Sequence, residues 1–219
     1  MLTLAEEIFI LSSLEKKESV RLPSSPSLPF ALAGAALMEL VLSGAARVDG
    51  GRLFLTVNSE RSENDPSKSV ILKIQKAGKA QKLNHWVFVL GSRGNHLSKS
   101  ILASLIDKEI LVENEQSYDR KVSNCAEAPR SHTTKFLLKR QLRDAMFCDG
   151  KADEHFVALL VLMESSGMLN HLFTTDELFW ARKQIKGLRK DVRFGKQTIE
   201  LYASILTAME YAIAASVSA

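Results

Sequence analysis

The segment from Phe30 to Gly44 reads FALAGAALMELVLSG, and it is small or apolar except at Glu39 and Ser43. Alanine and leucine favour helix, and short side chains let neighbouring helices pack close to the backbone. The segment is shorter than the roughly 20 apolar residues that span a bilayer. It therefore predicts a buried central helix in a mainly α-helical protein.

The segments on either side of this helix also carry local signals. Thr3 and Glu6 form a T-x-x-E capping box before the apolar run of residues 8–11, which predicts a helix start. The Asp-Gly-Gly sequence at residues 49–51 supplies the positive-φ positions of a tight turn, and it predicts a β-hairpin near 46–57. Three of the five prolines fall in residues 15–29, which predicts a loop.

The same order of two helices and a hairpin is predicted again at residues 67–122, with a small hairpin near 110–122. The spacing of Leu97, Ile101 and Leu105 predicts a helix within it. A polar loop at 123–130 precedes four predicted helices at roughly 133–147, 153–166, 175–190 and 196–216. Thr174 and Glu177 form a second capping box. With 219 residues, the chain is long enough for one large domain or two small ones.

Residues suited to catalysis are scattered. The five histidines lack paired metal-ligand spacing, and Cys125 and Cys148 are too far apart for a metal knuckle or a redox C-x-x-C. The two cysteines are predicted to be free thiols in a reducing compartment. Acidic pairs at 153–154 and 176–177 fall in first helical turns, where the helix dipole favours them. We expect no metal site, no cofactor and no enzymatic activity.

A formal charge of +4 and a pI near 9.0 are compatible with an anionic partner. The strongest basic run covers residues 182–196, where Asp191 is the single acid. On a helix, this run predicts either a solvated face or a basic surface that lies against anionic headgroups. The predicted membrane-facing residues are Arg182, Lys186, Arg189, Lys190 and Arg193.

A smaller basic cluster, Arg93, His96 and Lys99, lies near a predicted helix start, where backbone N–H groups favour phosphate. The alternative is a turn followed by a helix cap at Gly94-Asn95. Nucleic-acid binding is disfavoured, although two helices and a hairpin resemble a winged helix. The first candidate recognition helix, residues 32–43, contains no basic residue, and the second, 97–109, has few.

Three later segments complete a family resemblance. They are HWVFVL from His85, LASLIDKEIL from Leu102 and VALLVLMESSGML from Val157. With the opening segments, they resemble the Golgi phosphoprotein 3 family over nearly the whole chain. The resemblance implies one domain at residues 1–219, a helical bundle wrapped by amphipathic helices. It also implies a non-enzymatic, peripheral membrane protein, since eukaryotic members bind phosphatidylinositol 4-phosphate at the Golgi.

In eukaryotic members, one tryptophan and three arginines form the headgroup pocket. The resemblance aligns these positions with the loop at 24–27, Ala33, Asn95 and Ser98, so none of the four is retained. These departures predict a divergent, prokaryotic-type member. Nearby basic residues are predicted to bind the headgroup instead: Arg21, Arg93, His96 and Lys99.

The first twenty residues contain four glutamates, unlike a signal peptide, which predicts a cytoplasmic protein. The resulting hypothesis is a peripheral adaptor on the cytosolic face of a membrane, the Golgi if the protein is eukaryotic, that binds anionic phospholipid. The alternative is a cytosolic protein-interaction module, with a protein partner or a homo-oligomer, that has lost lipid binding.

Overall fold

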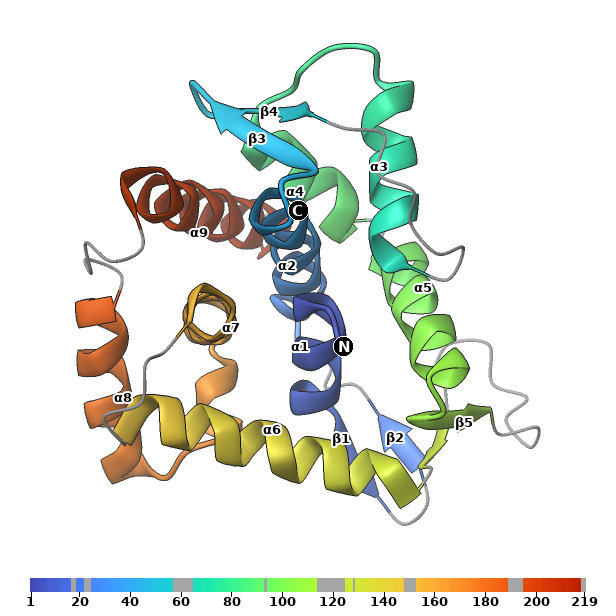
Figure 1. Cartoon of the computed structure of the whole chain (residues 1–219), viewed down its shortest axis with the longest axis vertical. Coiled ribbons are helices and arrows are strands. Elements are labelled where there is room, and N and C mark those ends of the chain that lie inside the picture. Colours follow the sequence, from blue (N-terminus) through green and yellow to red (C-terminus); the bar gives the residue numbers. More distant parts are fainter. Residues whose placement is uncertain are drawn as a thin grey trace.

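The computed structural model describes residues 1–16, 19–21, 25–56, 65–92, 94–113, 125–127, 129–147, 153–188 and 195–217. Helices dominate these residues, as the sequence predicts, and two small antiparallel sheets accompany them (Figure 1).

The predicted central helix is confirmed as α2 (Leu28–Leu42). The helices that contact it most extensively are α1 (Leu4–Ser12), α4 (Leu83–Ser92), α7 (Glu154–Ser165) and α9 (Gly195–Val217). Ala31 and Ala35 on α2 are completely buried. A Cβ atom on Gly34 would lie 2.9 Å from the Met209 sulfur of α9, so the absence of a side chain allows the two helices to approach closely.

The remaining helices lie at the outside of this bundle. They are α3 (Pro66–Lys76), α5 (Gly94–Asp107), α6 (Pro129–Phe147), the short 3₁₀ helix η1 (Met168–His171) and α8 (Thr175–Leu188). The four helices predicted in the second half of the chain are α6, α7, α8 and α9. The predicted loop at 123–130 is partly wrong, because α6 begins at Pro129, four residues earlier than predicted.

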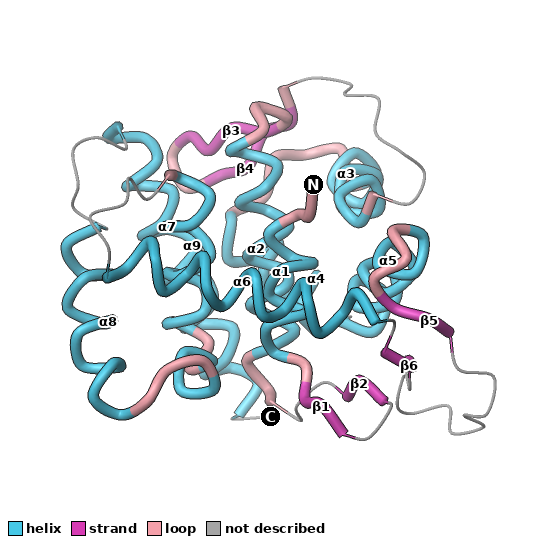
Figure 2. The backbone as a smooth tube through the Cα atoms, turned by 60° about the horizontal axis from the view of Figure 1, so that its bottom comes forward, coloured by secondary structure: helices cyan, strands magenta, loops and turns pink. Residues whose placement is uncertain are grey.

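The first predicted hairpin is confirmed as β3 (Ala46–Asp49) paired with β4 (Arg52–Leu55). Gly50 and Gly51 have φ angles of 54° and 70°, the positive values that the turn requires. Its inner face carries Val48 opposite Leu53, and Leu53 is buried in the core. Figure 2 shows this hairpin well separated from the other strands.

The second sheet corrects two predictions. Its order is β1 (Leu14–Lys16), β2 (Ser19–Arg21), β6 (Cys125–Glu127) and β5 (Leu111–Glu113) (Figure 2). Two strands, at 14–16 and 19–21, therefore occupy the first part of the loop that the sequence predicts at 15–29. The return strand of the second hairpin is at 125–127, whereas the segment predicted for it, near 118–122, lies outside the described residues.

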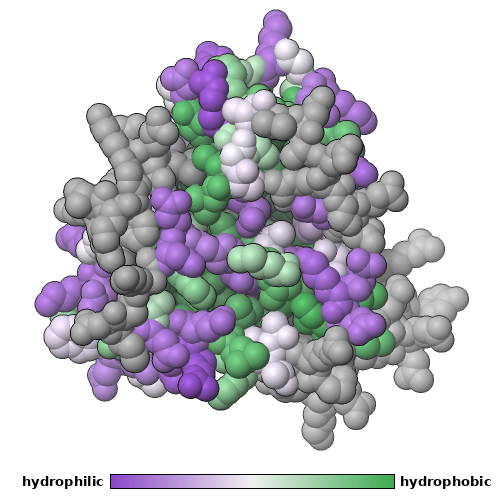
Figure 3. All heavy atoms as spheres, in the orientation of Figure 1, coloured by the Kyte–Doolittle hydropathy of each residue, from purple (hydrophilic) through white to green (hydrophobic). Residues whose placement is uncertain are grey.

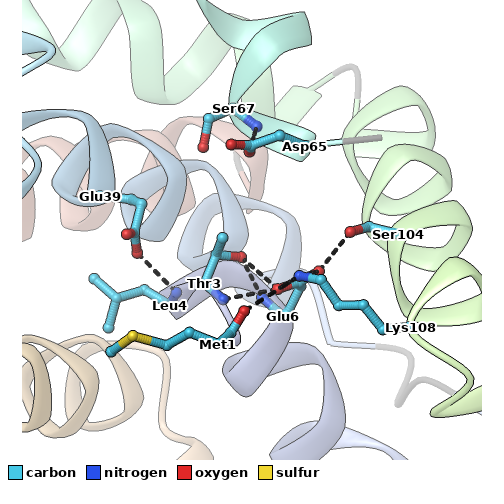
Figure 4. Close-up of polar contacts among 9 residues, drawn as sticks. All are labelled: Met1, Thr3, Leu4, Glu6, Glu39, Asp65, Ser67, Ser104 and Lys108. Atoms are coloured by element: carbon cyan, nitrogen blue, oxygen red, sulfur yellow. Dashed lines mark hydrogen bonds and ion pairs between the residues drawn. The ribbon is translucent and has the colours of Figure 1, made fainter. Parts of the chain in front are cut away.

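A buried polar network joins α1 to α5 (Figure 4). The predicted capping box is present: Thr3 N–H donates to the Glu6 carboxylate at 2.7 Å, and Glu6 N–H donates to the Thr3 hydroxyl at 3.3 Å. The Glu6 side chain is completely buried, and its carboxylate also accepts from Lys108 Nζ at 2.6 Å and from Ser104 Oγ at 2.7 Å. Glu39 of α2 accepts from Leu4 N–H at 3.0 Å. Carboxylates thus tie the start of α1 to α2 and to α5.

Gly91 on α4 is expected to tolerate no side chain without a loss of stability. A Cβ atom there would overlap the Phe30 ring, with Phe30 Cδ1 nearest and Cε1 at 2.7 Å. Phe30 is buried, so the ring has little room to move. Replacement of Gly91 by Ala is expected to lower the free energy of unfolding by about 1–2 kcal/mol through overpacking, measured by urea denaturation.

The matched control is Gly187→Ala on α8, where a Cβ atom would meet nothing within 4 Å. Alanine is the better helix former, so this change is expected to raise stability by roughly 0.5–1 kcal/mol. Equal effects of the two substitutions would contradict the close packing of α4 on Phe30.

Candidate functional site

The described residues place Arg21 and Lys99, two of the four predicted headgroup residues, in different parts of the fold. Lys99 is exposed on α5, and His96 lies in the first turn of the same helix, although its side chain lies outside the description. Arg93 is also outside the described residues. Arg21 ends β2, whose sheet includes β5, the strand that follows the other end of α5. The backbone therefore does not bring Arg21 beside the first turns of α5.

The positions that the resemblance aligns with headgroup residues are occupied in other ways. Ala33 is completely buried in α2. In the loop before α2, Ser27 Oγ donates to the Ser166 carbonyl oxygen at 2.8 Å. A ligand at the surface has no access to Ala33 without repacking of the core.

The predicted basic run begins on α8, whose first turn is capped as the sequence predicts. Thr174 N–H donates to the Glu177 carboxylate at 2.8 Å, and Arg143 on α6 donates to it at 3.1 Å. The backbone hydrogen bond from Thr174, together with its hydroxyl and Arg143, lowers the pKa of Glu177 from its usual value. Ala181 and Ile185 are buried on the inner side of α8, which packs against α7. These contacts leave the opposite side of α8 in solvent.

Two adjacent aromatic side chains project from the exposed side of α8. Phe179 is 68% exposed and Trp180 is 53% exposed, and their rings meet edge to face at a centroid distance of 5.6 Å. Lys183 Nζ lies 5.1 Å from the centre of the Trp180 ring, which is a cation–π contact. Other large apolar side chains are exposed on the described surface, but here two exposed aromatic rings are in contact with each other.

Cations flank the two rings. Arg182 and Lys186 are exposed one helical turn apart, and Arg182 donates to the Asn170 side chain at 3.4 Å. Asp176, at the start of the helix, is the nearby exposed acid among the described residues. Three predicted residues, Arg189, Lys190 and Arg193, lie outside the described residues. We define the α8 face as Phe179, Trp180, Arg182, Lys183 and Lys186.

This combination of residue types suits the boundary between water and an anionic bilayer. Tryptophan and phenylalanine partition into the headgroup region, and lysine and arginine are attracted by anionic lipid at about 1 kcal/mol each. The sequence interpretation found Arg182 and Lys186 but missed both aromatic residues. The signal was available, because helical geometry puts Phe179 and Lys183 opposite Ala181 and Ile185.

A shallow depression of about 420 Å³ has the opposite charge. It is lined by residues of α2 and of the start of α7: Glu39, Leu42, Ser43, Asp153, Glu154 and His155. Three carboxylates against one histidine make it unsuited to an anionic ligand. The α8 face is therefore the better candidate site for an anionic partner.

Across the described ranges, no group of three or more His, Cys, Asp or Glu side chains is arranged to hold a metal ion. None of the helices in those ranges combines the length and apolarity needed to cross a bilayer.

Comparisons with known proteins give one finding. The family model described as Golgi phosphoprotein 3 (GPP34) matches residues 4–205, which is nearly the whole chain. No curated protein matches the chain significantly.

Proposed function

Because the chain belongs to the Golgi phosphoprotein 3 (GPP34) family, we propose that it is a non-enzymatic peripheral membrane adaptor. Its ligand in this proposal is the anionic phospholipid surface on the cytosolic side of a membrane, the Golgi if the protein is eukaryotic. As an adaptor, it would bind this lipid surface and also a second protein.

The α8 face is the observation that carries this proposal. Phe179 and Trp180 offer apolar rings for the headgroup region, and Lys183 lies against one of them. An interfacial helix gains affinity from buried apolar area and from attraction to anionic lipid. A basic helix without exposed aromatic residues would supply only the second of these contributions.

The proposed selectivity is for negative surface charge rather than for one headgroup. Recognition of phosphatidylinositol 4-phosphate in a pocket needs cations that converge on the phosphate. The buried Ala33 argues against such a pocket at the position of a family arginine. We therefore expect equal retention on vesicles of equal charge with and without phosphatidylinositol 4-phosphate.

The test is co-sedimentation with vesicles of neutral lipid, of anionic phosphatidylserine mixtures, and of charge-matched mixtures with phosphatidylinositol 4-phosphate. The double variant Phe179→Ala/Trp180→Ala is expected to bind anionic vesicles about tenfold more weakly, because it removes the inserted apolar area. High salt is expected to reduce retention of both proteins, because salt screens exposed charges.

The matched control removes two aromatic side chains of similar exposure elsewhere. Phe136 on α6 and Tyr211 on α9 are each 64% exposed. The variant Phe136→Ala/Tyr211→Ala is expected to bind vesicles as the wild type does. Equal losses in the two double variants would contradict a specific role for α8.

Tryptophan fluorescence gives a second readout. The chain has two tryptophans, and Trp86 is buried whereas Trp180 is exposed. Anionic vesicles are expected to shift the emission to the blue, and Trp180→Phe is expected to abolish that shift. Absence of retention on every vesicle would overturn the proposal and favour the alternative, a protein-interaction module that has lost lipid binding.

A further inference from the structure

A second basic surface lies on the β3–β4 hairpin and the segment that pairs with it. Arg52 on β4 is the bridge partner of Lys82, which directly precedes α4. Two backbone hydrogen bonds fix this pairing: Leu53 N–H donates to Gln81 at 3.1 Å, and Leu83 N–H donates to Gly51 at 2.9 Å. The hairpin therefore gains a third, short extended segment along β4.

One face of this small sheet is exposed to solvent and carries charged side chains. Arg52 is opposite Asp49 on one side and Lys82 on the other, so the three side chains share a face. Arg47 joins this face because it is two residues from Asp49. The other face carries Val48 and the buried Leu53, so the charged face is directed away from the core.

Positive charge on this face exceeds what its own acid can balance. Lys79 and Lys76 lie exposed in the segment that leads to Lys82. We define the hairpin platform as the three cations of this face, Arg47, Arg52 and Lys82, together with the exposed Lys76 and Lys79 in the segment that leads to Lys82. Among the described residues of these segments, Asp49 is the one carboxylate, and it pairs with Arg47 at 3.4 Å. Figure 3 shows hydrophilic side chains gathered at the top of the molecule, in the region of the hairpin.

The arrangement of Arg52 and Lys82 opposes stability. Like charges directly opposite each other in a sheet destabilise the pairing. An anionic partner would turn this repulsion into attraction. The sequence agrees, since residues 66–106 contain seven Lys or Arg residues and no Asp or Glu.

Both arginines are held in place before any partner binds. The Arg47 guanidinium lies 4.8 Å from the centre of the Phe54 ring and pairs with Asp49. Arg52 Nη1 donates to the Ala80 carbonyl oxygen at 3.0 Å, which leaves its other N–H groups to face solvent. A positioned guanidinium fork matches the planar geometry of a carboxylate.

We infer that the hairpin platform is a docking surface for an acidic, extended segment of a partner protein. Unlike the α8 face, it offers no ring for insertion into lipid, because its aromatic residue, Phe54, is half-buried beside Arg47. Figures 1 and 2 both place the hairpin and α8 at separate edges of the molecule. This inference rests on the proposed function only in that a protein attached to the membrane through α8 would leave the platform accessible to that partner.

The test is fluorescence anisotropy with a fluorescein-labelled Glu/Ser peptide at low salt, and with a Gln/Ser peptide as the neutral probe. The variant Lys76→Ala/Lys79→Ala/Lys82→Ala is expected to bind the acidic peptide about tenfold more weakly, because each exposed cation contributes modestly. The matched control is Arg182→Ala/Lys183→Ala/Lys186→Ala, which removes the same charge from α8. It is expected to weaken peptide binding much less than the platform variant does, because α8 lies at another edge of the molecule.

Vesicle and oligonucleotide binding by the same variants complete the experiment. The platform variant is expected to keep vesicle retention, and the α8 variant is expected to lose it. Equal weakening of peptide binding in both variants would show attraction to net charge only, and no peptide binding would exclude the site. Loss of vesicle or single-stranded DNA binding in the platform variant alone would assign the surface to membrane or nucleic acid instead. If the wild type does not bind vesicles but its peptide binding depends on the platform, the membrane proposal fails and the docking proposal stands.

Discussion

Replacement of Lys108 by methionine is expected to lower the free energy of unfolding by about 3 kcal/mol at neutral pH. Lys108 Nζ lies 2.6 Å from the Glu6 carboxylate, and Glu6 is completely buried. Methionine keeps the length and the apolar stem of the side chain but removes the charge. The carboxylate would then stay buried with its bonds to Thr3 and Ser104 but without its counter-ion.

The measurement is urea denaturation followed by circular dichroism, with Lys99→Met as the control. Lys99 is exposed on α5, the helix that ends just before Lys108, so its replacement removes the same charge without uncovering a buried partner. We expect the control to change stability by less than about 0.5 kcal/mol. A Lys108→Met protein as stable as the control would show that Glu6 does not depend on this ion pair.

The helices that the sequence predicts correctly are those with a local signal. Leu97, Ile101 and Leu105 recur every four residues, and all three are buried on α5. The capping box at Thr3 and the glycine turn at residues 50–51 each act within a few residues. In these elements, neighbours in the sequence supply most of the information that determines the backbone.

The strands β1 and β2 pair with each other, but both are too short for the sequence to reveal them, and the second partner of β2 is distant in the sequence. Each has three residues, too few for an alternating pattern, and Val20 pairs with Cys125. Prolines and serines after Arg21 correctly indicate a break before α2, but they made the whole segment look like a loop. Only the fold brings residues 125–127 beside β2.

The residues of the candidate sites also divide into those with a local signal in the sequence and those that only the fold brings together. Arg182 and Lys186 were predicted because one helix carries both, and the structure finds them exposed. Phe179 and Trp180 were missed because aromatic residues in an amphipathic helix are normally assigned to the core. The pairing of Arg52 with Lys82 was not predictable from spacing, since it needs a bridge between the hairpin and the segment before α4.

Stability is also expected to depend on the protonation of His155, at the start of α7. Its Nε2 atom lies 2.7 Å from the carboxylate of Glu7 on α1. Burial acts to lower the pKa of His155, but the hydrogen bond and charge of Glu7, with Glu39 on α2 and Asp153 before α7, outweigh it. The net effect raises the pKa above the usual 6.5.

The direction of the pH dependence follows from this raised pKa. The folded protein binds the proton more tightly than the unfolded chain, so the stabilisation is complete below pH 6.5. It is lost as the pH rises through the folded-state pKa. His155→Gln is therefore expected to cost about 2 kcal/mol at mildly acidic pH, where it leaves the buried Glu7 without a cation, and less at alkaline pH.

Urea denaturation of the wild type and of His155→Gln across this pH range measures the difference directly. His85→Gln is the matched control, because His85 is exposed on α4. Its difference from the wild type is expected to stay small and nearly constant with pH. A His155→Gln difference that grows toward alkaline pH would contradict the charged pair, since it would mean that the neutral imidazole makes the stabilising contact. A difference that shrinks as the pH rises would identify Glu7 and protonated His155 as the ion pair that joins α1 to α7.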